Sequence, residues 1–275
     1  MQNLKLGFIG GGHIAQAMIS GLILKNFSAS NILVSAATNK NQLKFNELKV
    51  KLTTDNVVVA KAADIILLCV PAKLAVETVK ALDAKLNLED KILVSCAALI
   101  SIAELENAIA SVHKPNILRC MPNITVSIAT GISLLYSRQP IPTNVTAVFE
   151  LISQIKIMPS EQLLEQATFI SGCGPGYIFY LLNAIVDAAM QLGFDRQIAH
   201  DLVLQMTISS AHYAKSGSSL EELYHSVCSE GGLTEHIINN LKQAGIANKI
   251  KSSITQASQQ LKPKPDDLLI NSIKE

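Results

Sequence analysis

Short apolar runs alternate with amphipathic stretches along the first 160 residues of the chain. The runs that are typical of buried strands lie at residues 4–9, 31–35, 64–70, 91–96, 116–120 and 131–136. Between them, the spacing of apolar residues predicts helices over about residues 14–25, 40–47, 74–82 and 102–110, with another beginning near Val57. Strands that alternate with helices in this way indicate an α/β domain built on a doubly wound parallel sheet.

The pattern changes near residue 160. From about Glu161 the apolar residues recur at helical spacing, and glycine-rich turns interrupt them. We therefore expect two domains, an α/β domain over residues 1–160 and an all-helical domain over residues 161–275. Two prolines and several charges in residues 262–275 predict a poorly ordered surface extension at the end.

Composition excludes several classes of protein. Hydrophobic residues make up 49% of the 275 residues, which is enough for a large core, and the formal net charge of +1 gives no electrostatic case for nucleic acid. The first strand begins within a few residues of the start, so no signal peptide is expected. An uninterrupted apolar stretch of about 18 residues is missing, which argues against a membrane span. A cytoplasmic location is expected.

The five cysteines lie far apart, mostly in apolar runs, without a C-x-x-C pair; they are Cys69, Cys96, Cys120, Cys173 and Cys228. This spacing favours reduced thiols that act as small core residues over a disulfide framework. The six histidines show no H-x-x-x-H or H-E-x-x-H spacing, so no metal site is expected.

A glycine-rich segment follows the first predicted strand directly. Gly10, Gly12 and Ala15 form a G-x-G-x-x-A pattern at the start of the first helix. Gly10 would permit the tight turn, Gly12 would let the backbone approach a pyrophosphate, and Ala15 would let the helix pack close to the strand. The free N–H groups and the positive end of that helix would then bind the phosphates. In this strand–turn–helix context the pattern predicts a Rossmann-like dinucleotide-binding domain.

The residues after the second predicted strand indicate which dinucleotide is used. An NAD-dependent enzyme normally places Asp or Glu there, where the acid binds the ribose hydroxyls. Here residues 34–40 read VSAATNK and contain no acid. An uncharged rim with Ser35, Thr38 and Lys40 accommodates a 2′-phosphate better, which favours NADP (NADPH), with NAD as the alternative.

Several segments together resemble the pyrroline-5-carboxylate reductase family. They are GFIGGGHIAQAMISGL from Gly7, SCAALISIAEL from Ser95, RCMPN from Arg119, SGCGPGYIFYLLNAIVDAAMQLGF from Ser171 and SEGGLT from Ser229. The resemblance runs in order over nearly the whole chain. It implies reduction of 1-pyrroline-5-carboxylate to L-proline by hydride transfer from NAD(P)H to the C=N carbon. It also implies a homodimer, or a higher homo-oligomer, built through the helical domain.

The resemblance also assigns residues to the two ligands. The cofactor-binding residues would be Ile9, Gly10, Gly11, Gly12, His13, Ile14, Ser35, Asn56, Cys69, Val70, Cys96, Ala97 and Ala98. The substrate-binding residues would be Ser229, Gly231, Gly232, Leu233 and Thr234, whose backbone N–H groups would hold the substrate carboxylate. The Thr234 hydroxyl would contact the ring nitrogen as the catalytic group. The alternative for Thr234 is a purely structural role as a helix N-cap.

The chain departs from the family pattern around the site. The usual Ala-Ala-Gly reads Ala97-Ala98-Leu99, and the usual Ser-Pro-Gly-Gly-Thr-Thr is SEGGLT over residues 229–234. These changes keep two alternatives open: a non-catalytic paralogue that still binds a nucleotide, and a reductase of a related cyclic imine. A β-hydroxyacid dehydrogenase is rejected, because that group requires a Lys on the helix after the glycine turn, and residues 177–183 contain none.

Overall fold

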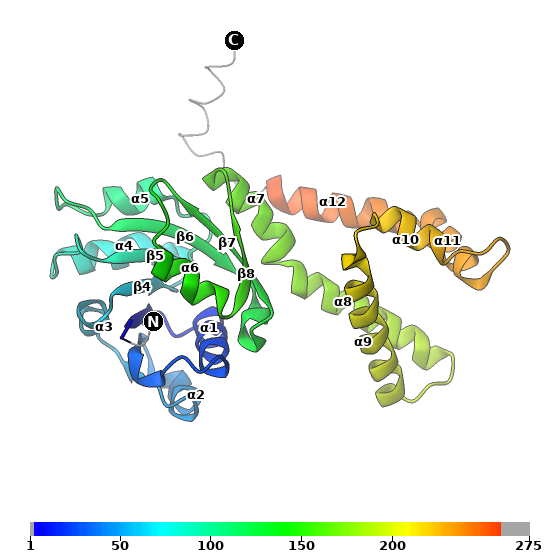
Figure 1. Cartoon of the computed structure of the whole chain (residues 1–275), viewed down its shortest axis with the longest axis horizontal. Helices are drawn as coiled ribbons and strands as arrows, with labels where there is room; N and C mark the ends of the chain where they lie inside the picture. The colour runs from blue at the N-terminus through cyan, green and yellow to red at the C-terminus, as the bar shows by residue number, and fades with distance from the viewer. Residues whose placement is uncertain (1–2, 260–275) are drawn as a thin grey trace, which may run out of the picture. The chain divides into compact units, whose positions relative to one another are not determined.

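The computed structural model describes residues 3–259, which divide into two compact units. The first unit extends to Pro175 and the second begins at Gly176 (Figure 1). The expected disordered extension at residues 262–275 lies outside the described residues.

The first unit is built on one eight-stranded sheet. Its strands are β1 (Leu6–Ile9), β2 (Ile32–Ser35), β3 (Lys51–Thr53), β4 (Ile65–Leu68), β5 (Ile92–Ser95), β6 (Asn116–Pro122), β7 (Gly131–Ser137) and β8 (Ser153–Ile157). They lie in the order β3-β2-β1-β4-β5-β6-β7-β8. All neighbouring pairs are parallel except β6 and β7. The Rossmann-like fold predicted for the first domain is therefore confirmed.

Helices cover both faces of this sheet. They are α1 (His13–Leu24), α2 (Gln42–Glu47), α3 (Asn56–Ala62), α4 (Ala72–Asp83), α5 (Ile102–Asn107), α6 (Thr143–Glu150) and α7 (Glu161–Ser171), with 3-10 turns η1 (Ala29–Asn31), η2 (Asn39–Asn41) and η3 (Ile124–Ile128). One core joins α1 and α6 to the sheet through Met18, Leu22 and Phe149. The other joins α3, α4 and α5 through Val59, Val79 and Leu105.

The position of a ligand crevice follows from the strand order. β1 lies between β2 and β4, so the chain turns to one side after β1 and to the other side after β4. In doubly wound sheets, ligands bind beyond the carboxyl ends of the strands at such a switch point. The residues from Gly10 and from Cys69 onward leave the sheet at this point.

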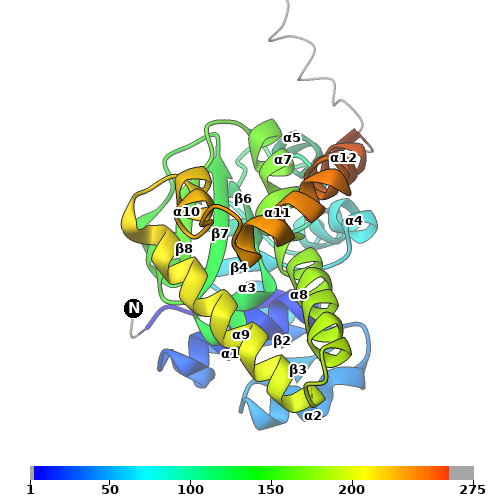
Figure 2. The ribbon, with the colours of Figure 1, turned by 90° about the vertical axis from the view of Figure 1, so that its right-hand side faces the viewer.

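The second unit consists of helices in the part of the chain that is described. α8 (Gly174–Gln191) begins at the end of the first unit and is followed by α9 (Arg196–Tyr213), η4 (Ala214–Ser216), α10 (Leu220–Ser226), α11 (Leu233–Gln243) and α12 (Ile246–Gln259). α8 and α9 pack side by side through Val186, Ala199 and Val203 (Figure 2). The prediction of a helical second half is confirmed.

Three elements were absent from the sequence prediction, and one pairing was wrong. The elements that were not predicted are β3, β8 and α6. Two of them, β3 and β8, are short edge strands that mix polar and apolar residues, so their apolar signal is weak. A fully parallel sheet was expected, but β6 and β7 are antiparallel. Only residues 123–130 join these two strands, and a parallel crossover needs about a dozen residues or more.

Candidate functional site

The turn after β1 requires glycine at its first position. Gly10 has φ of 102°, a left-handed conformation that side chains with a Cβ rarely adopt. A Cβ at Gly10 would also lie only 2.6 Å from the carbonyl carbon and oxygen of Cys69. The tight turn predicted from the motif thus brings the backbones that follow β1 and β4 into direct contact.

The next part of the turn leaves the start of α1 accessible. Gly12 is the N-cap of α1, and no side chain among the described residues caps its first N–H groups. A Cβ at Gly12 would meet no described atom within 4 Å. His13 is exposed at the first helical position. An open, uncapped helix N-terminus offers N–H groups and a positive dipole end to an anion.

Two amide side chains fix the middle of the turn. Gln16 donates from Nε2 to the carbonyl oxygen of Gly11 at 2.9 Å, and Asn41 donates from Nδ2 to the same oxygen at 2.8 Å. The Gly11 carbonyl therefore has both of its accepting directions occupied. These two positioning residues were not predicted, since neither belongs to the glycine motif.

The rim beyond β2 differs from the expectation in one respect. The Ser35 side chain is completely buried, and its hydroxyl donates to the Phe8 carbonyl oxygen at 3.5 Å. Its hydroxyl therefore faces the interior rather than the rim. The exposed side chains that follow are Ala37, Thr38 and Lys40. The exposed side chains of this rim are thus either uncharged (Ala37, Thr38) or cationic (Lys40).

The remaining predicted cofactor residues follow strand ends or begin a helix. Cys69 and Val70 follow β4, and Cys96, Ala97 and Ala98 follow β5. Since parallel strands end at one edge of the sheet, both segments lie at the edge that carries the glycine-rich turn. Asn56 is the half-buried first residue of α3, whose N-cap Asp55 accepts a bond from Val57 N.

The loop after β5 contains a residue in a strained conformation. Leu99 has φ of 65° and its side chain is 46% exposed. The family pattern has glycine at this position, and the left-handed conformation explains why glycine fits it best. Leu99 retains the backbone shape without glycine, and its amide N–H donates to Glu165 Oε1 at 3.0 Å.

A buried ionic cluster supports this loop from below. Arg119 on β6 is completely buried and pairs with Glu161 at 3.2 Å and with Glu165, both on α7. Its Nη2 also donates to the carbonyl oxygen of Ala97 at 2.9 Å. Glu161 Oε1 accepts the amide N–H of Ile102 at 2.8 Å. The cluster thereby binds both ends of the segment from Ala97 to Ile102 to the sheet and to α7.

The predicted substrate segment lies in the second unit, between α10 and α11. Gly231 has φ of 70°, and its N–H donates to Glu235 Oε2 at 2.7 Å. Gly232 is the N-cap of α11, and its N–H donates to the Ser229 carbonyl oxygen at 2.9 Å. A side chain from the first turn of α11 therefore occupies one of these amides, which the motif did not predict.

Thr234 is the second residue of α11, and its side chain is exposed. The alternative that Thr234 serves as the helix N-cap is wrong, because Gly232 occupies the cap position. Leu233, the first helical residue, is 84% exposed. The hydroxyl of Thr234 and the first N–H groups of α11 thus lie on an accessible helix end.

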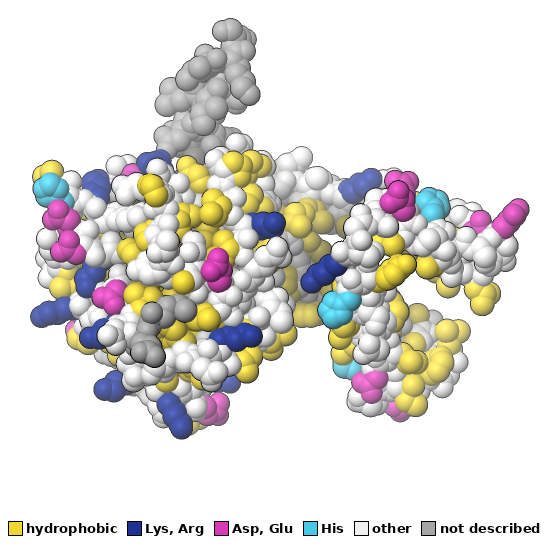
Figure 3. Space-filling view, in the orientation of Figure 1, with side chains coloured by type: hydrophobic (Ala, Val, Ile, Leu, Met, Phe, Trp, Pro, Cys, Tyr) yellow, Lys and Arg dark blue, Asp and Glu magenta, His cyan; other side chains and the backbone are white. Residues whose placement is uncertain are grey.

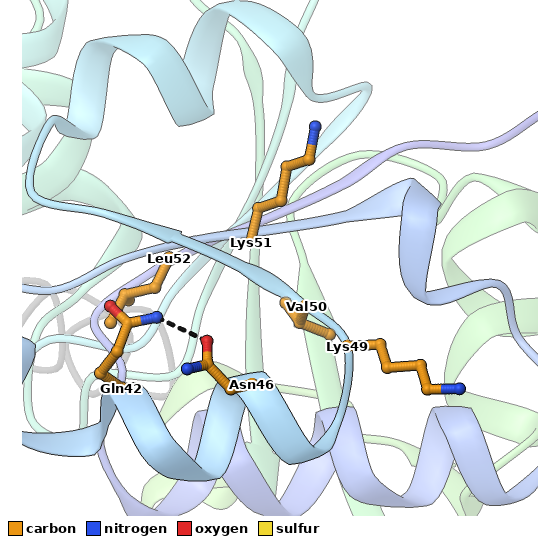
Figure 4. A pocket seen from close by; sticks show the side chains of 6 residues that line it. All are labelled: Gln42, Asn46, Lys49, Val50, Lys51 and Leu52. Carbon is orange, nitrogen blue, oxygen red and sulfur yellow. Dashed lines mark hydrogen bonds between the residues drawn. The ribbon is translucent and has the colours of Figure 1, made fainter.

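Two surface pockets lie apart from these residues. One, with a volume of about 510 Å³, lies beside α2 and β3 and is lined by Gln42, Asn46, Lys49, Val50, Lys51 and Leu52 (Figure 4). Gln42 donates to Asn46 Oδ1 at 2.8 Å across one side of it. The other lies between α4 and α5. Neither includes a residue of the glycine-rich turn, so the candidate site rests on the strand ends instead.

The fold and the turn define a class of protein, one with a dinucleotide-binding domain followed by a helical domain. Residues 5–99 match the family model described as "NADP oxidoreductase coenzyme F420-dependent". Residues 161–263 match the model described as pyrroline-5-carboxylate reductase dimerisation.

Individual relatives agree with these matches. The chain is 32% identical over 251 residues to a pyrroline-5-carboxylate reductase of Corynebacterium melassecola, covering 88% of this chain and 91% of the relative. It is 28% identical to that of Methanosarcina acetivorans, covering 95% and 98%. The crystal structure of a Plasmodium falciparum pyrroline carboxylate reductase with NADP bound has a TM-score of 0.85, with 25% identity and 95% and 98% coverage. The chain belongs to the pyrroline-5-carboxylate reductase family, as its motifs predicted.

One stretch of the described residues is long and apolar enough to span a membrane by length and composition, Glu161–Gln191. No stretch of this kind was predicted from the sequence. Its first part, α7, packs on β7 and contributes Leu164 to a buried cluster with Met121 and Leu134. The whole stretch lies within the region that matches the dimerisation model. An interface between subunits therefore explains its apolar surface without a lipid bilayer.

Proposed function

We propose that this protein reduces 1-pyrroline-5-carboxylate to L-proline with NAD(P)H. The observation that carries the proposal is the turn from Gly10 to Gly12, which lies at the switch point of the sheet in a chain of this family. An open, uncapped α1 N-terminus and an empty space beside Gly12 are the features that a pyrophosphate requires.

The cofactor-binding groups follow from this position. The backbone of Ile9–Ile14 would hold the pyrophosphate, and Asn56 would lie near the adenosine. Cys69 and Val70 would line the groove, and the segment from Cys96 to Ala98 would lie beside the nicotinamide. Ser35 would contribute through its backbone, since its hydroxyl is buried. When bound, the nicotinamide supplies the hydride for the C=N carbon.

The preferred cofactor in this proposal is NADPH. The rim after β2 carries no acid that would bind a ribose 2′-hydroxyl or repel a 2′-phosphate. The exposed Lys40 ammonium and Thr38 hydroxyl provide a charge and a donor for that phosphate. NADH is the alternative cofactor.

The substrate would bind at the start of α11. The first N–H groups of α11 would hold the carboxylate, together with the Gly231 N–H once Glu235 releases it. Gly232, whose N–H donates to the Ser229 carbonyl oxygen, would shape the turn, and Ser229 and Leu233 would flank the carboxylate. Thr234 would place its hydroxyl at the ring nitrogen and would orient the imine. A protonated ring nitrogen makes the imine carbon electrophilic, so positioning by these groups would carry much of the catalysis.

The protein would assemble as a homodimer through the second unit. Large apolar side chains of α8 and α9 are exposed on this chain, among them Ile178, Phe179, Leu202, Met206 and Ile208. Figure 3 shows hydrophobic side chains gathered on the surface of these helices. Contiguous apolar surface of this kind marks an interface. We further propose that the second functional domain begins after residue 160, although its first helix, α7, packs with the first compact unit. A cytoplasmic location and, as an option, a larger homo-oligomer also belong to the proposal.

One assay tests the activity against its alternatives. The purified protein is mixed with NADPH and 1-pyrroline-5-carboxylate, and the loss of NADPH absorbance and the formation of proline are followed together. The proposal expects both signals in equal amounts. NADPH binding without turnover would identify a non-catalytic paralogue. Turnover only with piperideine-type or other cyclic imines would identify a reductase of a related substrate.

A further inference from the structure

Three cysteines occupy equivalent positions on three neighbouring strands. Leu68 on β4, Ser95 on β5 and Arg119 on β6 are paired in register. The residues that follow them in the chain are Cys69, Cys96 and Cys120. They therefore form one row across the sheet, and all three pack against the same hydrophobic core. Neighbouring strands are about 4.8 Å apart, so each thiol of the row lies next to the following one.

The three thiols differ in their access to solvent. Cys120 is completely buried and Cys69 is 8% exposed, whereas Cys96 between them is half-buried. All three are free thiols. Of the row, Cys96 is therefore the member that a dissolved reagent reaches most easily.

The same arrangement shifts the pKa values of the three thiols in different directions. Hydrogen bonds with Cys120 and Cys69 lower the pKa of the Cys96 thiol well below its usual range, and the charge of Arg119 acts in the same direction. The hydrogen bond with Cys96 together with burial raises the pKa of Cys69, and burial raises the pKa of Cys120. Of the three thiols, Cys96 is therefore the one whose ionised form the surroundings favour most. The thiolate is the nucleophilic form.

We propose that Cys96 is a modification site for hydroperoxides, and that Cys69 converts the oxidised Cys96 into a disulfide. In the first step the Cys96 thiolate attacks a peroxide oxygen and the O–O bond breaks. The products are a sulfenic acid on Cys96 and, after protonation, water or an alcohol. In the second step the Cys69 sulfur attacks the Cys96 sulfur, the S–O bond breaks and water leaves. Two thiols lose two electrons and the hydroperoxide gains them.

The positions of the strand ends favour Cys69 over Cys120 as the partner. Cys69 and Cys96 are each the first residue beyond a strand, where the backbone can adjust. Cys120 lies inside β6, paired with β5 on one side and β7 on the other. A strand separation of about 4.8 Å falls within the Cα range that a disulfide accepts, roughly 4.4–6.8 Å.

Oxidation would reach the cofactor groove through Cys69. The backbone of Cys69 lies directly against Gly10, so closely that a Cβ on Gly10 would clash with it. A disulfide that shifts Cys69 therefore shifts the glycine-rich turn. This consequence, lower NADPH affinity in the oxidised protein, rests on the proposed function, whereas the disulfide itself does not.

The test maps the oxidised residues on the full-length protein. Reduced protein is treated with hydrogen peroxide, remaining thiols are blocked with iodoacetamide under denaturing conditions, and peptides are identified by mass spectrometry. We expect a Cys69–Cys96 disulfide with Cys120 alkylated, formed about tenfold faster than oxidation of the exposed Cys173. Dithiothreitol reverses it. A Cys96 that stays reduced while Cys173 oxidises overturns the proposal.

Three variants separate the roles of the thiols, and each is checked for folding by its melting temperature. Cys96→Ser abolishes the disulfide. Cys69→Ser leaves a sulfenic acid on Cys96 that dimedone traps. Cys120→Ser, the matched control, still forms the disulfide. A Cys96–Cys120 disulfide in the Cys69→Ser protein would overturn the assignment of the partner.

Calorimetry then connects the disulfide to the cofactor. The reduced protein should bind NADPH, the oxidised protein should bind it at least about tenfold more weakly, and bound NADPH should slow peroxide oxidation of Cys96. Equal affinity of the two forms would refute the coupling. If the reduced protein binds no NADPH, the proposed function fails, while the peptide map still decides whether Cys96 is the modification site.

Discussion

Arg119 and Glu161 form an ion pair of 3.2 Å although the arginine side chain is completely buried. The pair joins residues 42 positions apart in the sequence, and Glu165 adds a second carboxylate to the same guanidinium. Two carboxylates around one guanidinium leave an excess negative charge, which backbone N–H groups of Ile102 and Leu99 stabilise. The cluster thus holds the loop that follows β5 against β6 and α7.

This charge count predicts an unequal effect of removing its members. Arg119→Met would leave the buried Glu165 carboxylate and the half-buried Glu161 carboxylate without a cation, and should lower the free energy of unfolding by about 3–5 kcal/mol. Glu165→Gln leaves the pair with Glu161 and should cost about 1–3 kcal/mol. Urea unfolding measures both. Arg138→Met is the matched control, because Arg138 pairs with Glu106 at the surface and should cost at most about 1 kcal/mol. Equal losses for Arg119 and Arg138 would contradict the prediction.

Substitution of the two glycines of the turn should affect different properties, NADPH binding for Gly12 and stability for Gly10. Gly12→Val places its side chain in open space, so the protein should fold normally and lose NADPH binding. Gly10→Val combines a positive φ with a backbone clash, so it should lower stability markedly. Calorimetry with NADPH and melting temperatures on the same samples distinguish these outcomes. Unchanged NADPH affinity in Gly12→Val would move the pyrophosphate site elsewhere.

The rim after β2 predicts a cofactor preference. The kcat/KM with NADPH should exceed that with NADH, since no acid faces the ribose and Lys40 is exposed. Lys40→Ala should lower kcat/KM with NADPH by about 3- to 10-fold, as expected for one exposed charge-assisted contact, and should leave NADH unaffected. The exposed Lys44, which pairs with Glu47, provides the control substitution Lys44→Ala. An enzyme that uses NADH equally well would disprove the preference.

Substitution of Thr234 should lower activity without lowering stability, because Thr234 is not the cap of its helix. Thr234→Ala should lower kcat/KM by about 10- to 1000-fold, equivalent to roughly 1.4–4 kcal/mol of transition-state stabilisation. Thr234→Ser should retain most activity. Because Gly232 is the cap of α11, neither substitution should remove a helix cap, and melting temperatures should stay close to that of the unmodified protein. Full turnover by Thr234→Ala would mean that the hydroxyl takes no part in the reaction.

The helical unit predicts an obligate homodimer. Its exposed apolar side chains, such as Phe179 and Met206, would face water in a monomer. Light scattering at micromolar concentration should give at least twice the mass of one chain. Met206→Glu should shift the mass toward the monomer, whereas Lys61→Glu on α3 should not. A monomeric mass for the unmodified protein would contradict the prediction.

Local signals account for what the sequence predicted. The steric demands of Gly10 and Gly12 act within a few residues. The spacing of apolar residues predicted most strands, most helices of the first unit and the helical second unit. Ser35 was expected at the rim, but as the last residue of β2 its side chain points into the core. Whether a strand-end side chain faces inward depends on register, which the sequence of one strand does not contain.

Relationships between distant segments could not be predicted. The partners of Arg119 lie on α7, and the only local hint was a charged residue within an apolar strand. The thiol row depends on the alignment of three strands, which is a property of the whole sheet. β8 escaped prediction for a related reason, since an edge strand with alternating exposure carries little apolar signal.

The bond from Gly231 N–H to Glu235 changes what substrate affinity would mean for this protein. The amide that we propose for the substrate carboxylate already holds a carboxylate of its own chain. Association would then be an exchange of one anion for another, and the measured constant would report the difference between them. The apparent affinity for the substrate would thus depend on how well water or another donor hydrogen-bonds to the Glu235 carboxylate once Gly231 releases it.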